Sequence, residues 1–371
     1  MTSVLVVNSG SSSLKLRVLD AADAVTASAD LYPWDGSPDD PGLRRFLAGL
    51  TGIGAAGHRV VHGGHRFTSA TLIDDDVVAG IGALTDLAPL HQPRALAGIE
   101  AVCAALPGVP AVACFDTAFH AGLPAAAAAY ALPAAWTRRF GLRRFGFHGL
   151  SHAYAARRAA QICAGLDAER HRVVTCHLGA GSSLAAILDG RSVDTTMGFT
   201  PLEGLVMATR SGSVDPGLLV WLLRHGGLTL DELSDGLELS AGLAGLADLP
   251  GGSGDLRDVR LAAVRGNPGA RLALDVHAHR LRAQIAAMAA ALGGLDTLVF
   301  TGGIGEHQAQ TRAEAASGLG FLGVAVDEGR NAAAQPDCDI SAPGAAVRTL
   351  VITAREDIEI ARQTRAVLAE N

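Results

Sequence analysis

Short apolar runs alternate along this chain with turns rich in glycine, serine and proline, a pattern typical of buried strands and intervening helices. An apolar run at residues 4–7 enters a polar turn at residues 8–13, and an alternating segment at residues 14–19 leaves it. We interpret this as a β-hairpin. Residues 173–188 repeat the same plan of buried strand, Gly/Ser turn and apolar strand. Two distant copies predict a duplicated domain.

The remaining periodicity predicts further elements. Apolar spacing and capping residues predict helices at residues 74–87, 95–106, 151–163, 271–292 and 358–368. Apolar runs predict buried strands at residues 109–115, 295–300 and 347–352, and residues 57–64 (GHRVVHGG) are expected to form a strand that ends in paired glycines. Residues 21–57 are poorly patterned, and we expect a loop followed by one short helix. Ser151 is expected to cap the helix that follows it. Alternating strands and helices place the fold in the α/β class.

Composition narrows the class of protein. At 371 residues and 49% hydrophobic, the chain is long enough for two cores. A net charge of −7 with 4% aromatic residues argues against a nucleic-acid partner. Charged residues and glycines interrupt every apolar run, and no basic leader precedes the first strand, so we expect a cytoplasmic protein with no membrane partner. Five dispersed cysteines indicate reduced thiols rather than disulfides.

Several segments carry candidate chemistry. The turn at residues 8–13, with Lys15 beyond it, has the small residues, hydroxyls and positive charge that bind a phosphate, although a solvated serine-rich hairpin tip is the alternative. Asp116 follows a buried strand at the end where ligands bind in α/β sheets. The alternative role is to cap the following turn with Thr117. Arg59 and Arg210 are candidate anion ligands, although the segment around Arg59, taken alone, favours a structural strand whose arginine pairs with a surface acid. His148 lies in a Gly-flanked aromatic turn, where a histidine is more often a hydrogen-bonded core residue than a catalyst.

Taken together, these segments resemble the acetate kinase family of the sugar kinase, Hsp70 and actin superfamily. The resemblance runs nearly from end to end, and the order and spacing of the motifs make the set specific. The matching segments are residues 8–15 (NSGSSSLK), 57–64 (GHRVVHGG), 115–120 (FDTAFH), 145–149 (FGFHG), 177–179 (HLG), 197–205 (MGFTPLEGL), 209–212 (TRSG) and 300–306 (FTGGIGE).

The resemblance implies two duplicated ribonuclease H-like domains of the actin-like ATPase type with a cleft between them. The N-terminal acid-substrate domain would comprise residues 1–148 plus 356–371, and the nucleotide-binding domain residues 149–355. The implied reaction transfers the γ-phosphoryl group of ATP to acetate, giving acetyl phosphate and ADP. Mg²⁺ is the implied cofactor and a homodimer the implied assembly.

The resemblance also implies roles for single residues. Arg59 and Arg210 would offset the repulsion between two anionic reactants when the cleft closes. His148 would donate to the transferring phosphoryl group, Asn8 and Asp116 would order phosphate and magnesium, and Glu356 would reach Mg²⁺ through water. The implied acid pocket is Val61, Leu90, Phe147 and Pro201. The implied nucleotide and phosphate contacts are Lys15, Ser11, Ser13, His177, Gly179, Gly181, Asp255, Leu256, Arg257, Gly303, Ile304 and Gly305.

The chain departs from the family pattern at several positions. Ala180 and His307 replace asparagines near the implied nucleotide site, Gln92 replaces another, and Leu150 replaces a threonine. Residues 354–355 read Ala-Arg where the family has Thr-Asn, and the 21–57 segment is short for the family. Losing one neutral hydrogen-bond donor costs about 0.5–1.5 kcal/mol, so we expect a divergent member that keeps its chemistry.

Other functions fit parts of the same pattern. Propionate or butyrate could be the preferred acid, because one methylene changes specificity by only about 1–3 kcal/mol. A sugar kinase would use Asp116 as a general base toward a hydroxyl, but the implied pocket lacks polar hexose-binding side chains. A nucleotide-binding regulatory homologue with weak activity is the alternative that Ala180 and His307 suggest.

Overall fold

The structure is a computed structural model that describes residues 3–10, 13–37, 39–89, 91–164 and 171–370. The chain forms two compact units, each described separately below. The first comprises Met1–Ala121, Phe147–Tyr154 and Arg355–Asn371, and the second comprises Gly122–Gly146 and Ala155–Ala354. This division differs from the expected boundary at residue 148, because residues 122–146 pack within the second unit. There the Arg144 guanidinium donates to the carbonyls of Thr196 and Met197 at 3.1 Å each.

The first unit contains a mixed six-stranded sheet. Its strands, in the order β3-β2-β1-β4-β6-β5, are Val25–Leu31, Leu14–Leu19, Ser3–Ser9, Ile53–Val60, Ala111–Phe115 and Thr71–Leu72. Strand β1 is antiparallel to β2 and parallel to β4, and β4 is parallel to β6. The predicted N-terminal hairpin is confirmed. The three central parallel strands end at one edge of the sheet.

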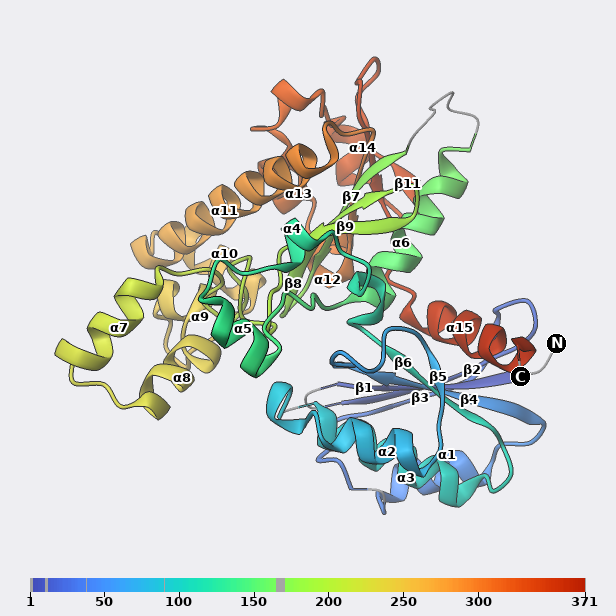
Figure 1. Ribbon diagram of the computed structural model, residues 1–371. Coiled ribbons are helices and arrows are strands. Elements are labelled where there is room, and N and C mark those ends of the chain that lie inside the picture. The colour runs from blue at the N-terminus through green and yellow to red at the C-terminus, as the bar shows by residue number, and fades with distance from the viewer. Residues whose placement is uncertain (1–2, 11–12, 38, 90, 165–170, 371) are drawn as a thin grey trace. The chain divides into compact units, whose positions relative to one another are not determined.

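Helices cover both faces of this first sheet. They are α1 (Pro41–Ala48), α2 (Asp75–Gly82), α3 (Gln92–Ala105) and α15 (Glu356–Glu370), with short 3₁₀ turns η1 (Thr85–Leu87) and η2 (Ala118–His120). Alternate residues of β1 point to opposite faces. Val4 and Val6 pack with Ile360 of α15, whereas Leu5 and Val7 pack with Val102 of α3. Figure 1 shows α15 on one side of the sheet and α1 to α3 on the other.

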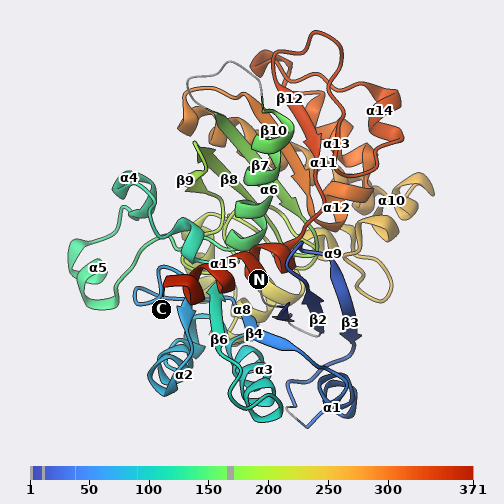
Figure 2. The same ribbon diagram turned by 90° about the vertical axis from the view of Figure 1, so that its right-hand side faces the viewer.

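The second unit repeats the sheet. Its strands, in the order β11-β12-β10-β7-β8-β9, are Cys338–Asp339, Arg348–Val351, Thr297–Thr301, Arg172–Leu178, Ser182–Leu188 and Arg191–Thr195. Figure 2 shows β9, β8, β7, β10 and β12 side by side in this order. Strand β7 is antiparallel to β8 and parallel to β10, and β10 is parallel to β12. Read in the reverse direction, from β9 to β11, the second sheet has a counterpart for each strand of the first: β7 corresponds to β1, β10 to β4 and β12 to β6. The expected α/β fold with two duplicated domains is confirmed.

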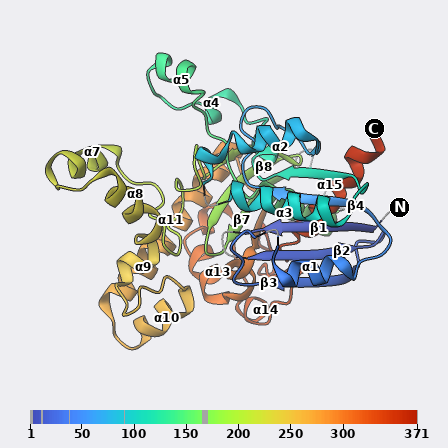
Figure 3. The same cartoon turned by 90° about the horizontal axis from the view of Figure 1, so that it is seen from below.

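The helices of the second unit gather partly on its sheet and partly away from it. They are α4 (Ala125–Ala128), α5 (Ala134–Phe140), α7 (Pro216–His225), α8 (Leu230–Leu239), α9 (Gly242–Ala247), α10 (Leu256–Val264), α11 (Pro268–Leu292), α12 (Gly302–His307), α13 (Ala309–Ala316), α14 (Glu328–Ala332) and η3 (Gly320–Leu322). Helix α11 packs on the sheet through Leu281, Ile285 and Met288. Helices α7 and α8 extend away from that sheet, as Figures 1 and 3 show.

Local sequence signals explain most of the helix ends. Asp74 caps α2 by accepting from the Val77 backbone N–H at 2.8 Å, and Gly293, with φ of 68°, ends α11. Two expectations were wrong. Residues 21–57 include strand β3, an edge strand whose polar residues hide its period, and α6 (Gly149–Ile162) begins before Ser151, so this serine is not its cap. Among the residues described, no helix is long and apolar enough to span a bilayer.

Candidate active site

The central strands of the first sheet bring three predicted site residues together. Asn8 lies near the end of β1, Arg59 near the end of β4, and Asp116 directly after β6. Asn8, Arg59 and Asp116 each lie two residues after a residue that faces α15, namely Val6, Gly57 and Cys114. Because side chains two positions apart in a strand share a face, all three point toward the face that α15 covers. Glu356 is the first residue of α15. The site therefore sits at the carboxyl ends of parallel strands, where ligands bind in α/β folds.

These four side chains form one hydrogen-bonded network. The Arg59 guanidinium donates to both Asp116 carboxylate oxygens, through Nε at 3.2 and 3.1 Å and through Nη2 at 2.7 Å. Its Nη1 donates to the Asn8 amide oxygen at 3.1 Å, and the Asn8 Nδ2 donates to Glu356 Oε2 at 2.7 Å. The Arg59 and Glu356 side chains are each 15% exposed and that of Asp116 is 1% exposed. Arg59 and Glu356 thus form the accessible edge of the network.

Burial and charge shift the ionisation of this network in opposing ways. Burial alone would lower the pKa of Arg59, but the charges of Asp116 and Glu356 and the Asp116 hydrogen bonds outweigh it and raise that pKa. Burial raises the pKa of Asp116 against the opposing effect of Arg59, and Glu356 raises it further. Because the guanidinium keeps its proton and donates three hydrogen bonds to the carboxylate, we treat the contact as an ion pair.

A second element of the site is the turn that carries His148. This residue adopts φ of +56° and is half-buried. Its carbonyl accepts from the His152 backbone N–H at 2.9 Å, which starts α6. The Gly149 N–H donates to the Asp116 carbonyl at 2.9 Å, and a Cβ at Gly149 would lie 2.1 Å from that oxygen. Glycine is therefore required for the close approach of this turn to the end of β6.

Apolar side chains lie beside the network in the same unit. Val61, 6% exposed, follows β4, and Phe147, 1% exposed, precedes His148. The Phe147 ring meets the His62 imidazole edge-on at 5.4 Å. Gln92, buried at the start of α3, donates to the His62 carbonyl at 3.0 Å and accepts from the His62 N–H at 3.3 Å. This replacement for the family asparagine thus supports the strand end that presents Val61.

The predicted phosphate turn of the first unit is described in part. Lys15 is exposed and lies directly opposite Asn8 in the β1–β2 ladder, so both side chains share one face of the sheet. The Ser13 carbonyl accepts from the Gly10 N–H at 2.7 Å. Ser11 and Leu90, a predicted member of the acid pocket, lie outside the described residues.

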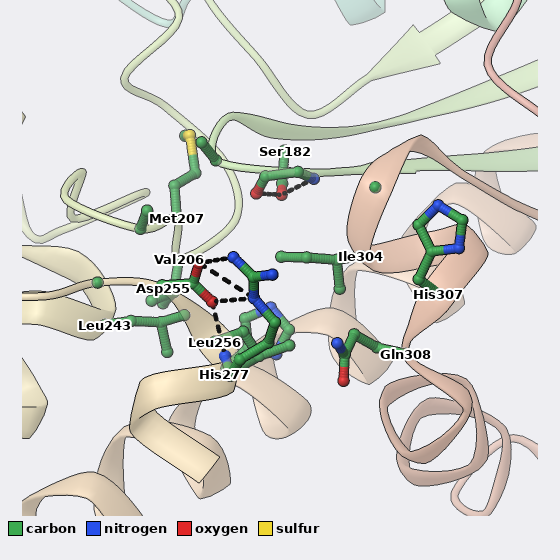
Figure 4. Close-up of a pocket in the computed structure, with 16 residues that line it drawn as sticks. Ser182, Val206, Met207, Leu243, Asp255, Leu256, His277, Ile304, His307 and Gln308 are labelled. Atoms are coloured by element: carbon green, nitrogen blue, oxygen red, sulfur yellow. Dashed lines mark hydrogen bonds and ion pairs between the residues drawn. The ribbon is translucent and has the colours of Figure 1, made fainter. Parts of the chain in front are cut away.

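The second unit contains a cavity of about 480 Å³. Six of the predicted nucleotide contacts line it, from the β7–β8 turn, the start of α10 and the start of α12: Gly179, Asp255, Leu256, Arg257, Gly303 and Ile304. No atom lies within 4 Å of the position that a Cβ on Gly303 would occupy. The departures Ala180 and His307 line the same cavity. Figure 4 shows Ile304, Met207 and Leu243 around it.

Polar groups at one side of this cavity are fixed by the start of α10. The Asp255 carboxylate accepts from the Arg257 backbone N–H at 2.8 Å and pairs with the Arg257 guanidinium at 2.6 Å (Figure 4). The hydrogen bonds from Arg257 hold the pKa of Asp255 below its ordinary value. His277 of α11 also lines the cavity, and its burial lowers its pKa to about 4. It therefore presents a neutral imidazole at neutral pH.

The predicted nucleotide contacts and the residues that line this cavity coincide only in part. Gly181, Gly305 and His177 are not among its lining residues. The Gly305 carbonyl instead accepts from Arg312 at 2.8 Å. The lining residues that were not predicted are Val206, Met207, Ala208, Leu243, Gly254, His277 and Gln308. Val206, Met207 and Ala208 lie between two of the matching segments, residues 197–205 and 209–212, and Gln308 lies two residues after residues 300–306. Leu243 and His277 lie in helices without a motif, and only their position in the fold identifies them.

Arg210 and Pro201 belong to the long irregular segment of the second unit. Burial lowers the pKa of Arg210, against the effect of the Glu238 charge. The segment is held by α8, because the Thr209 hydroxyl donates to the Glu238 carbonyl at 2.9 Å and the Ser211 N–H donates to the Leu237 carbonyl at 3.0 Å. The role of Arg210 in binding an anion stays a prediction, as does the role of Pro201 in the acid pocket.

Known proteins match this sequence and fold. A family model described as "Acetokinase family" matches residues 44–362. The chain belongs to the acetokinase family. It is 53% identical to the acetate kinase of Gloeobacter violaceus, over 87% of this chain and 78% of that protein.

Solved structures of the acetokinase family share the whole fold. The acetate kinase of Porphyromonas gingivalis superposes with a TM-score of 0.88 at 35% identity, over 99% of this chain and all of that one. The propionate kinase of Francisella tularensis subsp. tularensis superposes with a TM-score of 0.89 at 35% identity over the same shares. The departures from the family pattern therefore leave the fold intact, and one of them, Leu150, is fully buried against α15.

Proposed function

We propose that this protein is an acetate kinase that transfers the γ-phosphoryl group of ATP to acetate. An acetate oxygen attacks the γ-phosphorus as the bond from that phosphorus to the bridging oxygen of ADP breaks. A carboxylate nucleophile carries no proton at neutral pH, so the reaction needs no general base. The observation that carries the proposal is the Asn8–Arg59–Asp116–Glu356 network at the strand ends of the first sheet.

Each residue of the proposed site has a distinct task. Arg59 neutralises charge on the transferring group, and Asp116 holds its guanidinium in a fixed orientation through paired hydrogen bonds. His148 donates a hydrogen bond to a phosphoryl oxygen, and Arg210 is the second cation. Val61 and Phe147 exclude water and receive the methyl group of acetate.

The nucleotide fits the cavity of the second unit. Val206, Leu243 and Ile304 give it apolar walls suited to a planar base, and Gly303 leaves space on one side. The two phosphate-binding turns are the glycine- and serine-rich ones, residues 8–13 and 179–183. ATP is therefore the proposed phosphoryl donor.

The oxygen donors of the first unit suit Mg²⁺. Asn8, Asp116 and Glu356 offer hard oxygen ligands, and few protein ligands fit an ion that keeps much of its water shell. No cluster of three or more His, Cys, Asp or Glu side chains able to hold a metal occurs in the part of the chain that the structure describes. Arg59, Asp116 and Glu356 sum to a formal charge of −1 (+1 −1 −1), which would repel two anionic reactants. Bound Mg²⁺ supplies the positive charge that reverses this sign.

Formation of acyl hydroxamate from ATP, Mg²⁺ and a short carboxylic acid tests the proposal. We expect acetate to be the best acid, and the Arg59→Ala and Arg210→Ala variants each to lose at least about a hundredfold in kcat/KM for acetate. ATP binding without acyl phosphate formation from any short acid would leave a regulatory nucleotide-binding protein instead. A loss well below a hundredfold would place the arginine concerned outside the site.

Propionate is the second candidate acid, because a propionate kinase superposes on this chain as closely as an acetate kinase does. Val61 and Phe147 are the described pocket residues on which the choice depends in the first unit. One methylene is worth about 1–3 kcal/mol in such a pocket. Equal or higher kcat/KM with propionate or butyrate than with acetate would reassign the substrate.

We also propose that the protein is a homodimer joined through α7 and α8. Helix α7 has no buried residue, and its Trp221 is 54% exposed, whereas an all-round apolar helix is normally buried. The surface is complementary to itself, because α7 ends in Arg224 and His225 and α8 carries Asp231, Glu232, Asp235 and Glu238. In a two-fold dimer, one patch meets the same patch of the second copy.

A matched pair of variants tests this assembly. Trp221→Glu should yield a monomer by light scattering, since it places a charge inside the contact. Trp136→Glu, on α5 and also 54% exposed, is the control and should remain dimeric. A monomeric wild-type protein at micromolar concentration, or a dimeric Trp221→Glu variant, would contradict the proposal.

A further inference from the structure

A buried histidine lies behind the turn that carries His148 and is absent from the mechanism above. His120 ends the short 3₁₀ turn η2, four residues after Asp116, and is fully buried. Its Nε2 lies 3.1 Å from the Phe147 carbonyl oxygen. A carbonyl can only accept, so the His120 ring must carry its proton on Nε2 and donate it there.

The hydrogen bond from His120 holds Phe147, the residue that directly precedes His148. Its carbonyl belongs to the peptide unit that enters His148, a residue with φ of +56°, a backbone region that costs a non-glycine residue about 1–2 kcal/mol. The peptide unit that leaves His148 is already held at both ends. The Gly149 N–H donates to the Asp116 carbonyl at 2.9 Å, and the His148 carbonyl accepts from the His152 N–H at 2.9 Å. On the entering side, the His120 imidazole is the side chain that donates to the carbonyl.

The surroundings of His120 fix its ring. The rings of Phe119 and His152 meet it edge-on, with centroids 5.4 and 5.8 Å away. Burial lowers the pKa of His120 to about 4, partly offset by its hydrogen bond to Phe147. The ring is therefore neutral near pH 7. A rigid, neutral donor holds one peptide orientation without adding charge next to the Arg59–Asp116 pair.

We propose that His120 is a positioning residue for phosphoryl transfer, which fixes the Phe147–His148 peptide so that the His148 side chain points at the transferring group. This inference rests on the proposed function. It makes His120 act through His148 and not on the substrates. A small misplacement of a catalytic group can cost about a hundredfold in rate.

Amide substitutions separate this role from simple packing. His120→Gln places an amide N–H near the position of the imidazole Nε2, whereas the shorter His120→Asn places it nearer Nδ1, out of reach of the Phe147 carbonyl. We expect Gln to keep kcat within severalfold of wild type and Asn to lose about 10- to 100-fold. KM for ATP should be unchanged in both. Similar kcat losses in both variants would overturn the proposal.

A double-mutant cycle with His148→Ala gives the decisive readout. If His120 works through His148, His120→Asn should lower kcat in the wild-type background and have little further effect once His148 is alanine. A merely structural role would lower kcat by the same factor in both backgrounds, and that result would refute the positioning role. Rates are normalised to the folded fraction of each variant, measured by far-UV circular dichroism. Acyl phosphate formation by wild type is measured alongside, because its absence would instead refute the proposed function.

Discussion

The Arg59–Asp116 pair makes a quantitative prediction about stability. Arg59→Ala leaves Asp116, 1% exposed, without the cation that donates three hydrogen bonds to it at 2.7–3.2 Å. Removing one partner of a buried ion pair costs about 3–5 kcal/mol, because the remaining charge stays buried without compensation. We expect a loss of that size in the free energy of unfolding of the first unit at pH 7.

A second substitution should restore part of this loss. In Arg59→Ala/Asp116→Asn the stranded charge is gone, and a buried neutral amide without its partner costs about 1–3 kcal/mol. The double variant should therefore be about 2 kcal/mol more stable than Arg59→Ala alone. A double variant that is more stable than Arg59→Ala would show that the buried charge of Asp116, and not lost packing, causes the loss of stability.

The pH dependence has a definite sign. Burial and Glu356 both raise the pKa of Asp116, and in Arg59→Ala the opposing effect of the guanidinium is absent. An acid whose folded pKa lies above its unfolded value, about 3.9, destabilises the fold increasingly as pH rises between the two values. The deficit of Arg59→Ala relative to the double variant should be full above the folded pKa and should shrink as pH falls toward about 4.

Tryptophan fluorescence during urea unfolding provides the assay. The chain has three tryptophans, of which Trp34 is 1% exposed in the first unit. Trp136 and Trp221 are each 54% exposed in the second unit, so replacing both by phenylalanine leaves Trp34 as a reporter of the first. If Arg59→Ala lowers the free energy of unfolding by less than about 1 kcal/mol, the contact is not a buried ion pair. The same conclusion follows if the stability difference between Arg59→Ala and the double variant does not change with pH.

Two further substitutions separate the proposed metal and nucleotide sites. Glu356→Gln should raise the Mg²⁺ concentration needed for half-maximal activity at least about tenfold, while Asp357→Asn, one residue further along α15 and paired with Arg355 at 2.9 Å, should not; equal Mg²⁺ titrations would remove Glu356 from the metal site. Gly303→Val should raise KM for ATP without changing KM for acetate, because its side chain would project into the cavity, whereas Gly320→Val, also in open space, should leave both unchanged. An unchanged KM for ATP in Gly303→Val would show that the nucleotide binds elsewhere.

Much of the first unit's site was predictable because its signals are local. Asn8 and Asp116 each lie at the end of an apolar run, and parallel strands bring such ends to one edge. That Arg59 would meet Asp116 was not predictable from periodicity. Taken alone, the segment containing Arg59 favours a structural strand whose arginine pairs with a surface acid. Its position beside Asp116 follows from strand order, which depends on packing across the whole sheet.

The misses have a common physical origin. Strand β3 is an edge strand of the first sheet, and it was read as loop because its residues, VTASADL, show little hydrophobic contrast. His277 and Leu243 line the cavity from helices whose sequences look like ordinary packing segments. His120 was visible within the FDTAFH motif, yet its importance comes from a contact with Phe147, 27 residues away in the sequence. Such contacts leave no mark on local composition.

The identical strand order of the two sheets has a consequence for how this protein can diversify. The first sheet carries Asn8, Arg59 and Asp116 at its strand ends, and the second carries Gly179 and Gly303 at the equivalent ends. Under the proposed function, Val61 and Phe147 of the first copy contact the acid, and the cavity of the second copy binds the nucleotide base. Mutations in one copy leave the hydrogen-bond ladders of the other untouched, so substitutions that line the cavity can alter nucleotide contacts while the first sheet keeps its strand pairing. Ala180 and His307 line the cavity of the second copy, whereas Arg59, Asp116 and His148 of the first copy keep the family's residues.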